Sequence, residues 1–120
     1  MRKAIALADL QRWEEVIVVY QEILKRDAKN ARALNKLAWT LLQNHQGKKT
    51  RYIQALQLAQ AAVKNAKPPR ADYYDTLAAA FWSLDHKQPA IASQQQALLL
   101  KPNDKNIKDR LRYYESRIEP

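Results

Sequence analysis

Apolar residues recur along most of this 120-residue chain at intervals of three and four, the spacing that places them on one face of an α-helix. Pro68 and Pro69 separate two such segments, Pro102 ends another, and Pro89 fits a first helical turn, where its missing N–H is no loss. The pattern predicts an all-α chain. Its seven predicted helices lie at about 3–9, 13–26, 31–44, 51–66, 71–84, 88–100 and 104–118.

Two of these helices repeat one another. The apolar and small residues of each keep the same spacing, and the two sets are Ala31, Leu34, Leu37, Ala38 and Leu41, then Ala71, Tyr74, Leu77, Ala78 and Phe81. The helix after each set carries two alanines seven residues apart, Ala55 and Ala62 in one case and Ala90 and Ala97 in the other. Because larger side chains would push crossing helices apart, we expect these alanines and Ala38 and Ala78 to lie where helices pack closely.

Residues 71–104, with Ala90, Ala97 and Pro102 in place, resemble one full unit of the tetratricopeptide repeat (TPR), a helix–turn–helix of about 34 residues. The resemblance covers essentially the whole chain, and its agreement is best from Ala31 to Asp104. It implies a right-handed α-solenoid of antiparallel helix pairs, with about two and a half TPR units plus a C-terminal capping helix. The run from Asp75 to Ala80 looks most like multi-repeat bacterial proteins.

The resemblance divides the single domain 1–120 into a partial repeat (1–30), a repeat with a long inner loop (31–70), a full repeat (71–104) and a capping helix (105–120). Arg112 stands where the two internal repeats carry Ala38 and Ala78, so a further helix there would bury a guanidinium, which indicates a cap. The partial repeat has only a stub, Lys3 to Asp9, for its first helix. We therefore expect the chain to be cut from a longer array or to begin with an abbreviated repeat.

TPR proteins act as adaptors, chaperone co-factors and assembly scaffolds, so the resemblance implies a protein–protein interaction module whose first helices line a concave groove. A peptide segment or helix of a partner would lie in that groove. The residues that the resemblance places there and that we expect to contact the partner are Arg32, Asn35, Lys36, Trp39, Asp72, Asp75, Thr76, Trp82, Arg110 and Tyr113.

The two groove tryptophans admit two interpretations. Trp39 and Trp82 could anchor a partner, since tryptophan, tyrosine and arginine dominate binding hot spots. They could equally pack between adjacent helices. Asp72 and Asp75 also admit two interpretations. They could pair with basic residues of a ligand, or they could form ion pairs between repeats beside Arg32 and Lys36.

The net charge of +9 is concentrated in one window. Between Asp27 and Asp72 there is no acidic residue, and the basic residues of the window are Lys29, Arg32, Lys36, Lys48, Lys49, Arg51, Lys64, Lys67 and Arg70. Such a field attracts acidic partners, although it also suits a solvated surface. The alternative function is a basic nucleic-acid-binding helical repeat, with aromatic residues for stacking. The scatter of these charges over groove, loop and outer helices speaks against it.

Several classes of site are not expected. The chain has no cysteine, its two histidines lack ligands at metal spacing, and no serine has a histidine at a suitable helical spacing, so we expect no metal, no cofactor and no enzymatic activity. No apolar run is long enough to span a bilayer, and no secretory signal is present, which leaves localisation undetermined. Ile5, Leu7 and Leu10 predict an apolar N-terminal end that favours self-association.

Overall fold

The computed structural model describes residues 2–44 and 48–118 of the chain, and the side chains of residues 12–43 and 48–118. These residues form helices and short connections, without a strand. The helices are α1 (Arg2–Arg26), α2 (Ala31–Asn44), α3 (Lys49–Asn65), α4 (Ala71–Ser83), α5 (Lys87–Leu100) and α6 (Lys105–Ser116). The predicted all-α class is confirmed, and the last five helices begin and end within two residues of the predicted bounds.

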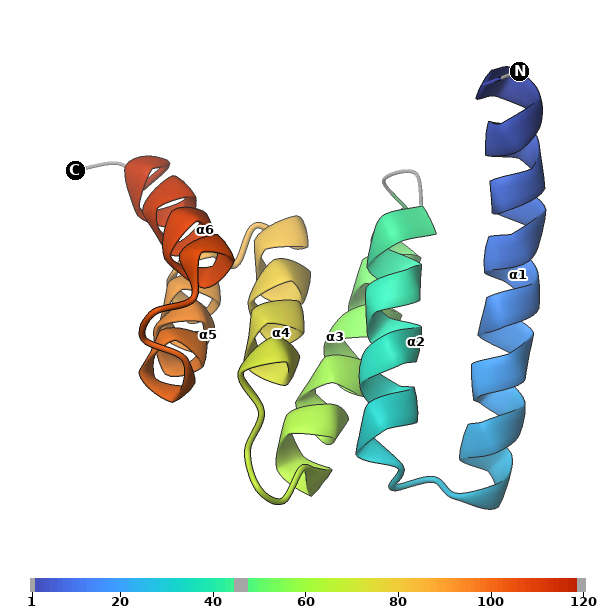
Figure 1. Ribbon diagram of the computed structural model, residues 1–120, viewed down its shortest axis with the longest axis horizontal. Helices are drawn as coiled ribbons and strands as arrows, with labels where there is room; N and C mark the ends of the chain where they lie inside the picture. The colour runs from blue at the N-terminus through green and yellow to red at the C-terminus, as the bar shows by residue number, and fades with distance from the viewer. Residues whose placement is uncertain (1, 45–47, 119–120) are drawn as a thin grey trace.

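The two separate helices predicted at 3–9 and 13–26 are wrong. A single helix, α1, runs through both. No glycine or proline lies between Asp9 and Trp13, and Leu10, Gln11 and Arg12 all favour helix, so nothing local ends the helix there. The N-terminal part of the chain is therefore one long helix beside α2, without a helix pair of its own (Figure 1).

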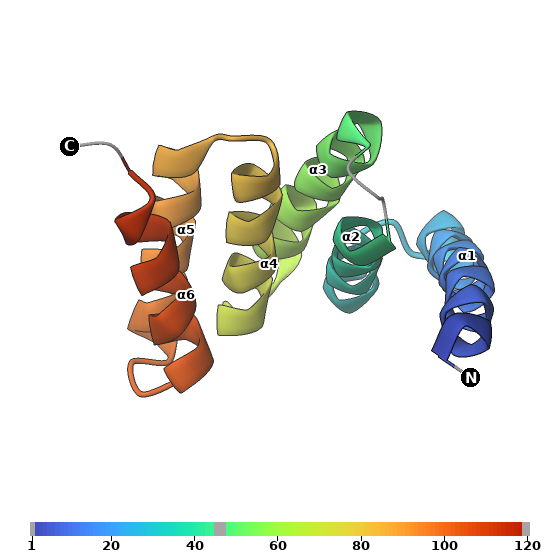
Figure 2. The ribbon, with the colours of Figure 1, turned by 90° about the horizontal axis from the view of Figure 1, so that it is seen from above.

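The helices stack as antiparallel neighbours in a row, with α1 at one end and α5 and α6 at the other (Figure 1). Each helix packs against the next one along the chain, and α2 also packs directly against α4. Seen from above, α2 lies below α3 and α6 lies below α5, with α4 between these two pairs (Figure 2). This arrangement brings the exposed faces of α2, α4 and α6 together along one surface of the molecule.

Small residues lie at the places where the helices cross. The six alanines predicted to lie there all have 0% exposure, namely Ala38, Ala55, Ala62, Ala78, Ala90 and Ala97. Larger apolar side chains fill the space beside them, with Ile17 of α1, Leu37 and Leu41 of α2 and Leu77 of α4 in one cluster. A methyl group is the largest side chain that such close crossings admit, so the alanine prediction is confirmed.

Local hydrogen bonds set the ends of the helices that carry the groove. The Asp104 carboxylate accepts a hydrogen bond of 3.0 Å from the Ile107 N–H and caps α6, as Asn30 does for Ala33 at the start of α2. After α4, Asp85 adopts a positive φ of 63°, and the His86 N–H donates to the Phe81 carbonyl. These contacts determine where α2, α5 and α6 begin.

The outward face of α6 is charged, as the prediction of a cap requires. Arg112 is exposed to solvent, whereas Ala38 and Ala78 at the matching positions of α2 and α4 are fully buried. Ile107, Leu111 and Tyr114 form the buried face of α6. In the described part of the chain, no helix is both long enough and apolar enough to cross a membrane.

Candidate partner-binding groove

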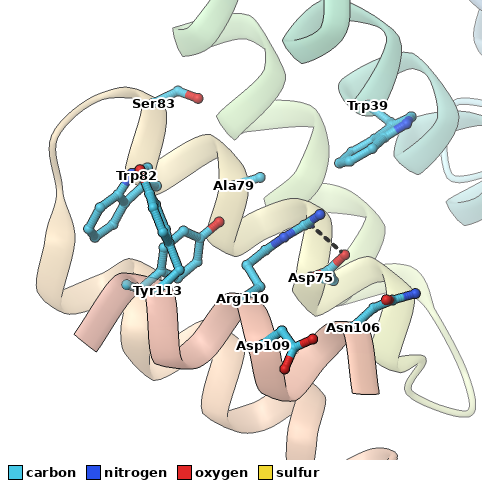
Figure 3. A pocket seen from close by; sticks show the side chains of 10 residues that line it. Trp39, Asp75, Ala79, Trp82, Ser83, Asn106, Asp109, Arg110 and Tyr113 are labelled. Carbon is cyan, nitrogen blue, oxygen red and sulfur yellow. Dashed lines mark hydrogen bonds and ion pairs between the residues drawn. The ribbon is translucent and has the colours of Figure 1, made fainter. Parts of the chain in front are cut away.

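An open pocket of about 720 Å³ lies on the surface formed by α2, α4 and α6 (Figure 3). Aromatic side chains, one ion pair and small polar groups line it: Trp39, Asp75, Ala79, Trp82, Ser83, Asn106, Asp109, Arg110, Tyr113 and Tyr114. A smaller pocket of about 150 Å³ between α2 and α4 shares Trp39 and Asp75 with it. Its other lining residues are Asn35, Lys36, Asp72 and Thr76. We call the two together the α2–α4–α6 groove.

The structure thus brings nine of the ten predicted groove residues to one surface, and Arg32, exposed on α2, lines neither pocket. Two of the nine face largely inward. Thr76 is buried, and its hydroxyl donates a hydrogen bond of 3.0 Å to the Asp72 carbonyl. Asn35 is also buried, and its Oδ1 has no hydrogen-bond partner among the described residues. Contact of these nine residues with a partner stays a prediction.

Asp75 is the centre of a polar network between helices. Its Oδ2 accepts a hydrogen bond of 2.9 Å from Nη1 of Arg110 on α6, and its Oδ1 accepts one of 2.9 Å from Nε2 of Gln94 on α5. Gln94 Nε2 also donates to the Ile107 carbonyl at 3.2 Å. The carboxylate of Asp75 is therefore held from both sides, and its charge is balanced within the chain.

Arg110 joins this network to α2. Its guanidinium carbon lies 5.8 Å from the centroid of the Trp39 ring, within range of a cation–π contact. In Figure 3, Arg110 extends between Asp75 and Trp39 across the middle of the groove. Trp39 itself is half-buried. Its indole thus presents part of its surface to the groove while Arg110 lies against it.

Trp82 packs within an aromatic cluster at the other side of the groove. Its ring stacks on Tyr114 with centroids 4.4 Å apart and planes at 20°, and it meets Tyr113 edge-on at 6.1 Å. Nζ of Lys87 lies 5.7 Å from the Trp82 ring centroid. Burial raises the pKa of the Tyr114 phenol to about 12, and Asp75 and Tyr113 also raise it, against the opposing effect of Arg110. Trp82 is therefore mainly a packing residue, since it also packs against the cluster of Ala78, Ala90 and Tyr114, whereas Trp39 contacts Arg110 across the groove.

The other groove acids also have basic neighbours. Asp72 accepts a hydrogen bond of 3.1 Å from Nε of Arg70, and Asp109 lies 3.7 Å from Nζ of Lys105. The sequence-based alternative of inter-repeat ion pairs holds for Asp75, but its partner is Arg110 and not Arg32 or Lys36. Within the described residues, Arg32 and Lys36 form no ion pair. Lys36 therefore gives α2 an uncompensated positive charge in the groove, and Arg32 adds a second one on the exposed surface of α2.

Several residues of the site are absent from the predicted set. Ser83 and Asn106 line the groove at its rim, Tyr114 supports Trp82, and Gln94 supports Asp75 from behind. A signal for Gln94 existed, because it lies between Ala90 and Ala97 on the stripe of residues expected to be buried. Among the described residues, no group of three or more histidines, aspartates and glutamates could hold a metal ion.

Comparison with known proteins agrees with this geometry at the level of the fold. The TPR domain of OM64 from Arabidopsis aligns with 98% of this chain and 92% of its own, with a TM-score of 0.78 and 23% sequence identity. The chain has the TPR fold. No model of a protein family and no curated protein matches the chain. The resemblance to TPR proteins is thus confirmed for the architecture, while the likeness to bacterial multi-repeat proteins stays a prediction.

Proposed function

We propose that this TPR chain is a protein–protein interaction module that holds a peptide segment or helix of a partner in the α2–α4–α6 groove. The observation that carries the proposal is the open pocket of about 720 Å³ between Trp39 and the Trp82–Tyr113 pair, with Ala79 beneath it. Such a pocket offers apolar surface for an anchoring side chain and polar groups that set its register. Its side chains are already held in place by contacts within the chain, which lowers the ordering cost of binding.

The charge of the groove supports an acidic partner. Asp72, Asp75 and Asp109 each have a basic neighbour within the chain, whereas Arg32 and Lys36 are exposed on α2 without an ion pair among the described residues. Acidic residues of a partner would therefore meet free positive charge on the α2 side of the groove. We expect its encounter with the chain to slow as salt is added.

The groove gives no support to the nucleic-acid alternative. Arg51 and Lys64 belong to α3, in the other layer of the stack. A basic surface that followed a nucleic-acid backbone would need these charges on the same side as Arg32 and Lys36.

Filling the groove tests the proposal. Ala79 lies partly exposed on the floor of the pocket, and Ala92 lies exposed on α5 in the other layer, so Ala79→Trp and Ala92→Trp form a matched pair. We expect a partner captured by the wild-type chain, once purified, to bind the Ala79→Trp variant at least about tenfold more weakly and the Ala92→Trp variant unchanged. Equal affinity for all three proteins in calorimetric titrations would refute a role of the groove.

One surface outside the groove supports a second candidate, self-association through α1. Val18 and Val19 are 54% and 56% exposed, and Ile23 is also exposed. Glutamates precede this apolar patch at positions 14 and 15, and basic residues follow it at 25 and 26. An antiparallel pairing of α1 with α1 of a second copy would bring opposite charges together around the valines. The predicted Ile5, Leu7 and Leu10 lie outside the described side chains.

Sedimentation velocity tests this second candidate over a range of protein concentrations. We expect the wild-type chain to dimerise as its concentration rises and Val19→Lys to remain monomeric. Gln57→Lys, an exposed polar position on α3, is the matched control and should behave as the wild type. A wild-type chain that stays monomeric throughout, or a Val19→Lys variant that dimerises as well, would exclude the α1 surface.

A further inference from the structure

The largest fully buried side chain among the described residues is polar. Gln94 of α5 has 0% exposure, although its neighbours on the same face of the helix, Ala90 and Ala97, are small and apolar. Both N–H bonds of its amide are used, since Nε2 donates 2.9 Å to Oδ1 of Asp75 and 3.2 Å to the Ile107 carbonyl. Its Oε1 is buried and has no partner within the described part of the chain.

The two donated hydrogen bonds and the unpartnered acceptor show whether Gln94 positions its neighbours or only fills space. A buried acceptor without a hydrogen-bond partner is unfavourable. An apolar side chain of similar size would fill the same space and avoid that cost. Only the amides of glutamine and asparagine offer two donors on one uncharged nitrogen. An apolar residue of the same volume would fill the space but could not donate these two hydrogen bonds. The hydrogen bonds are therefore what Gln94 adds at this position.

The two acceptors of Gln94 belong to the elements that carry the groove. Asp75 on α4 is the ion-pair partner of Arg110, and Ile107 lies one turn before Arg110 on α6. Arg110 in turn lies against Trp39 on α2. A continuous set of contacts thus leads from Gln94, behind the groove, through Asp75 and Arg110 to Trp39, and its last three members appear together in Figure 3.

We propose that Gln94 is a positioning residue for the groove: it holds the Asp75 carboxylate and the first turn of α6, and thereby sets where Arg110 lies against Trp39. The importance of this placement for a partner rests on the proposed function. The placement itself needs no partner. Gln94 never contacts a ligand in the groove, because it is fully buried on the other side of Asp75.

Nuclear magnetic resonance of the free chain tests the placement directly. Gln94→Met keeps the volume and removes both donors, and Gln95→Met makes the same change at the next position of α5, which is exposed. We expect Gln94→Met to shift the indole N–H signal of Trp39 and the Nε–H signal of Arg110, while the indole signal of Trp13 on α1 stays in place. Gln95→Met should leave all three signals unchanged.

A purely structural role for Gln94 predicts another result. In that case the Trp39 and Arg110 signals of Gln94→Met would be unchanged, as those of Gln95→Met are expected to be. This result would overturn the proposal. If Gln94→Met unfolds the chain, as loss of helicity in circular dichroism would show, Gln94→Glu provides the test at acidic pH. There the protonated carboxyl can still donate one hydrogen bond to Asp75.

The Gln94→Glu variant should therefore depend on pH. The groups that contact the side chain at position 94 are Asp75 on α4 and the Ile107 carbonyl on α6, and Arg110 of α6 is bound to the other oxygen of Asp75. Burial and the Asp75 charge would raise the pKa of the new carboxyl in the folded chain. Stability present in acid would then be lost as the pH rises through that raised pKa. We expect the Trp39 signal to match the wild type in acid and to move away from it toward neutral pH; a signal independent of pH would overturn the proposal.

Failure of this inference and failure of the proposed function are distinguishable. If Ala79→Trp does not weaken the captured partner but Gln94→Met moves the Trp39 signal, Gln94 positions Arg110 in a surface that is not the binding site. If Ala79→Trp abolishes binding but Gln94→Met changes nothing at Trp39, the groove binds the partner and Gln94 has no positioning role.

Discussion

The ring of Trp82 on α4 stacks on the ring of Tyr114 on α6, with centroids 4.4 Å apart. This contact attaches the capping helix to the preceding repeat, together with the Asp75–Arg110 ion pair. The same contact also gives the two groove tryptophans different roles, although the sequence analysis allowed the same two interpretations for both. Both indoles are half-buried, but Trp82 packs against Tyr114 and the core cluster beside it, whereas Trp39 contacts Arg110 across the groove.

The two tryptophans should therefore respond differently to truncation. We expect Trp82→Ala to lower the free energy of unfolding by about 2–3 kcal/mol, since it removes a partly buried indole and its stacking partner. Trp39→Ala should cost less than about 1 kcal/mol and leave helicity near the wild-type value. Urea unfolding measures both changes. Equal losses for the two variants would contradict the assignment of Trp82 to packing and Trp39 to the open surface.

Enlarging a crossing alanine should be far more costly than enlarging an exposed one. Ala90 on α5 is fully buried beside Ala78 and Tyr114, whereas Ala92 on the same helix is exposed. We expect Ala90→Leu to destabilise the chain by about 1–3 kcal/mol or more, because the helices cannot separate without losing other contacts. Ala92→Leu should stay within about 0.5 kcal/mol of the wild type. Thermal unfolding of both variants checks the difference.

The Tyr114 phenol should make the chain less stable in strong alkali. Burial is the main reason that its pKa is raised to about 12, above its ordinary value of 10.0. A group whose pKa is higher in the folded chain contributes stability below the unfolded pKa and loses it as the pH rises through the folded pKa. The free energy of unfolding should thus fall between about pH 10 and pH 12. In Tyr114→Phe, which keeps the stacking on Trp82, this fall should be smaller; the same fall in both proteins would show that another group causes it.

Much of the fold could be predicted from the sequence because the features that determine it are local. Apolar spacing and prolines predicted the bounds of α2 to α6, and the recurrence of alanines predicted the closest helix crossings. The failed division of α1 has a local cause as well. The TPR pattern implied a break between Asp9 and Trp13, but no residue there disfavours helix, so one helix continues through the segment.

The site was only partly predictable because its contacts join distant parts of the chain. The resemblance to TPR proteins placed Trp39, Asp75, Trp82 and Arg110 on one surface, and all four line the groove. Spacing along single helices could not assign Arg110 as the partner of Asp75, or Tyr114 as the partner of Trp82. These pairings depend on how α6 docks on α4, a tertiary relation that no local pattern encodes.

Site-specific photo-crosslinking tests the central claim, that a partner lies in the α2–α4–α6 groove. Ser83 is exposed on the rim of the pocket, and Gln95 is exposed on α5 in the other layer, so a photoreactive benzoylphenylalanine at each position samples the two surfaces without filling the groove. The groove account predicts that the partner crosslinks at position 83 and not at position 95. Crosslinking at position 95 alone would contradict it.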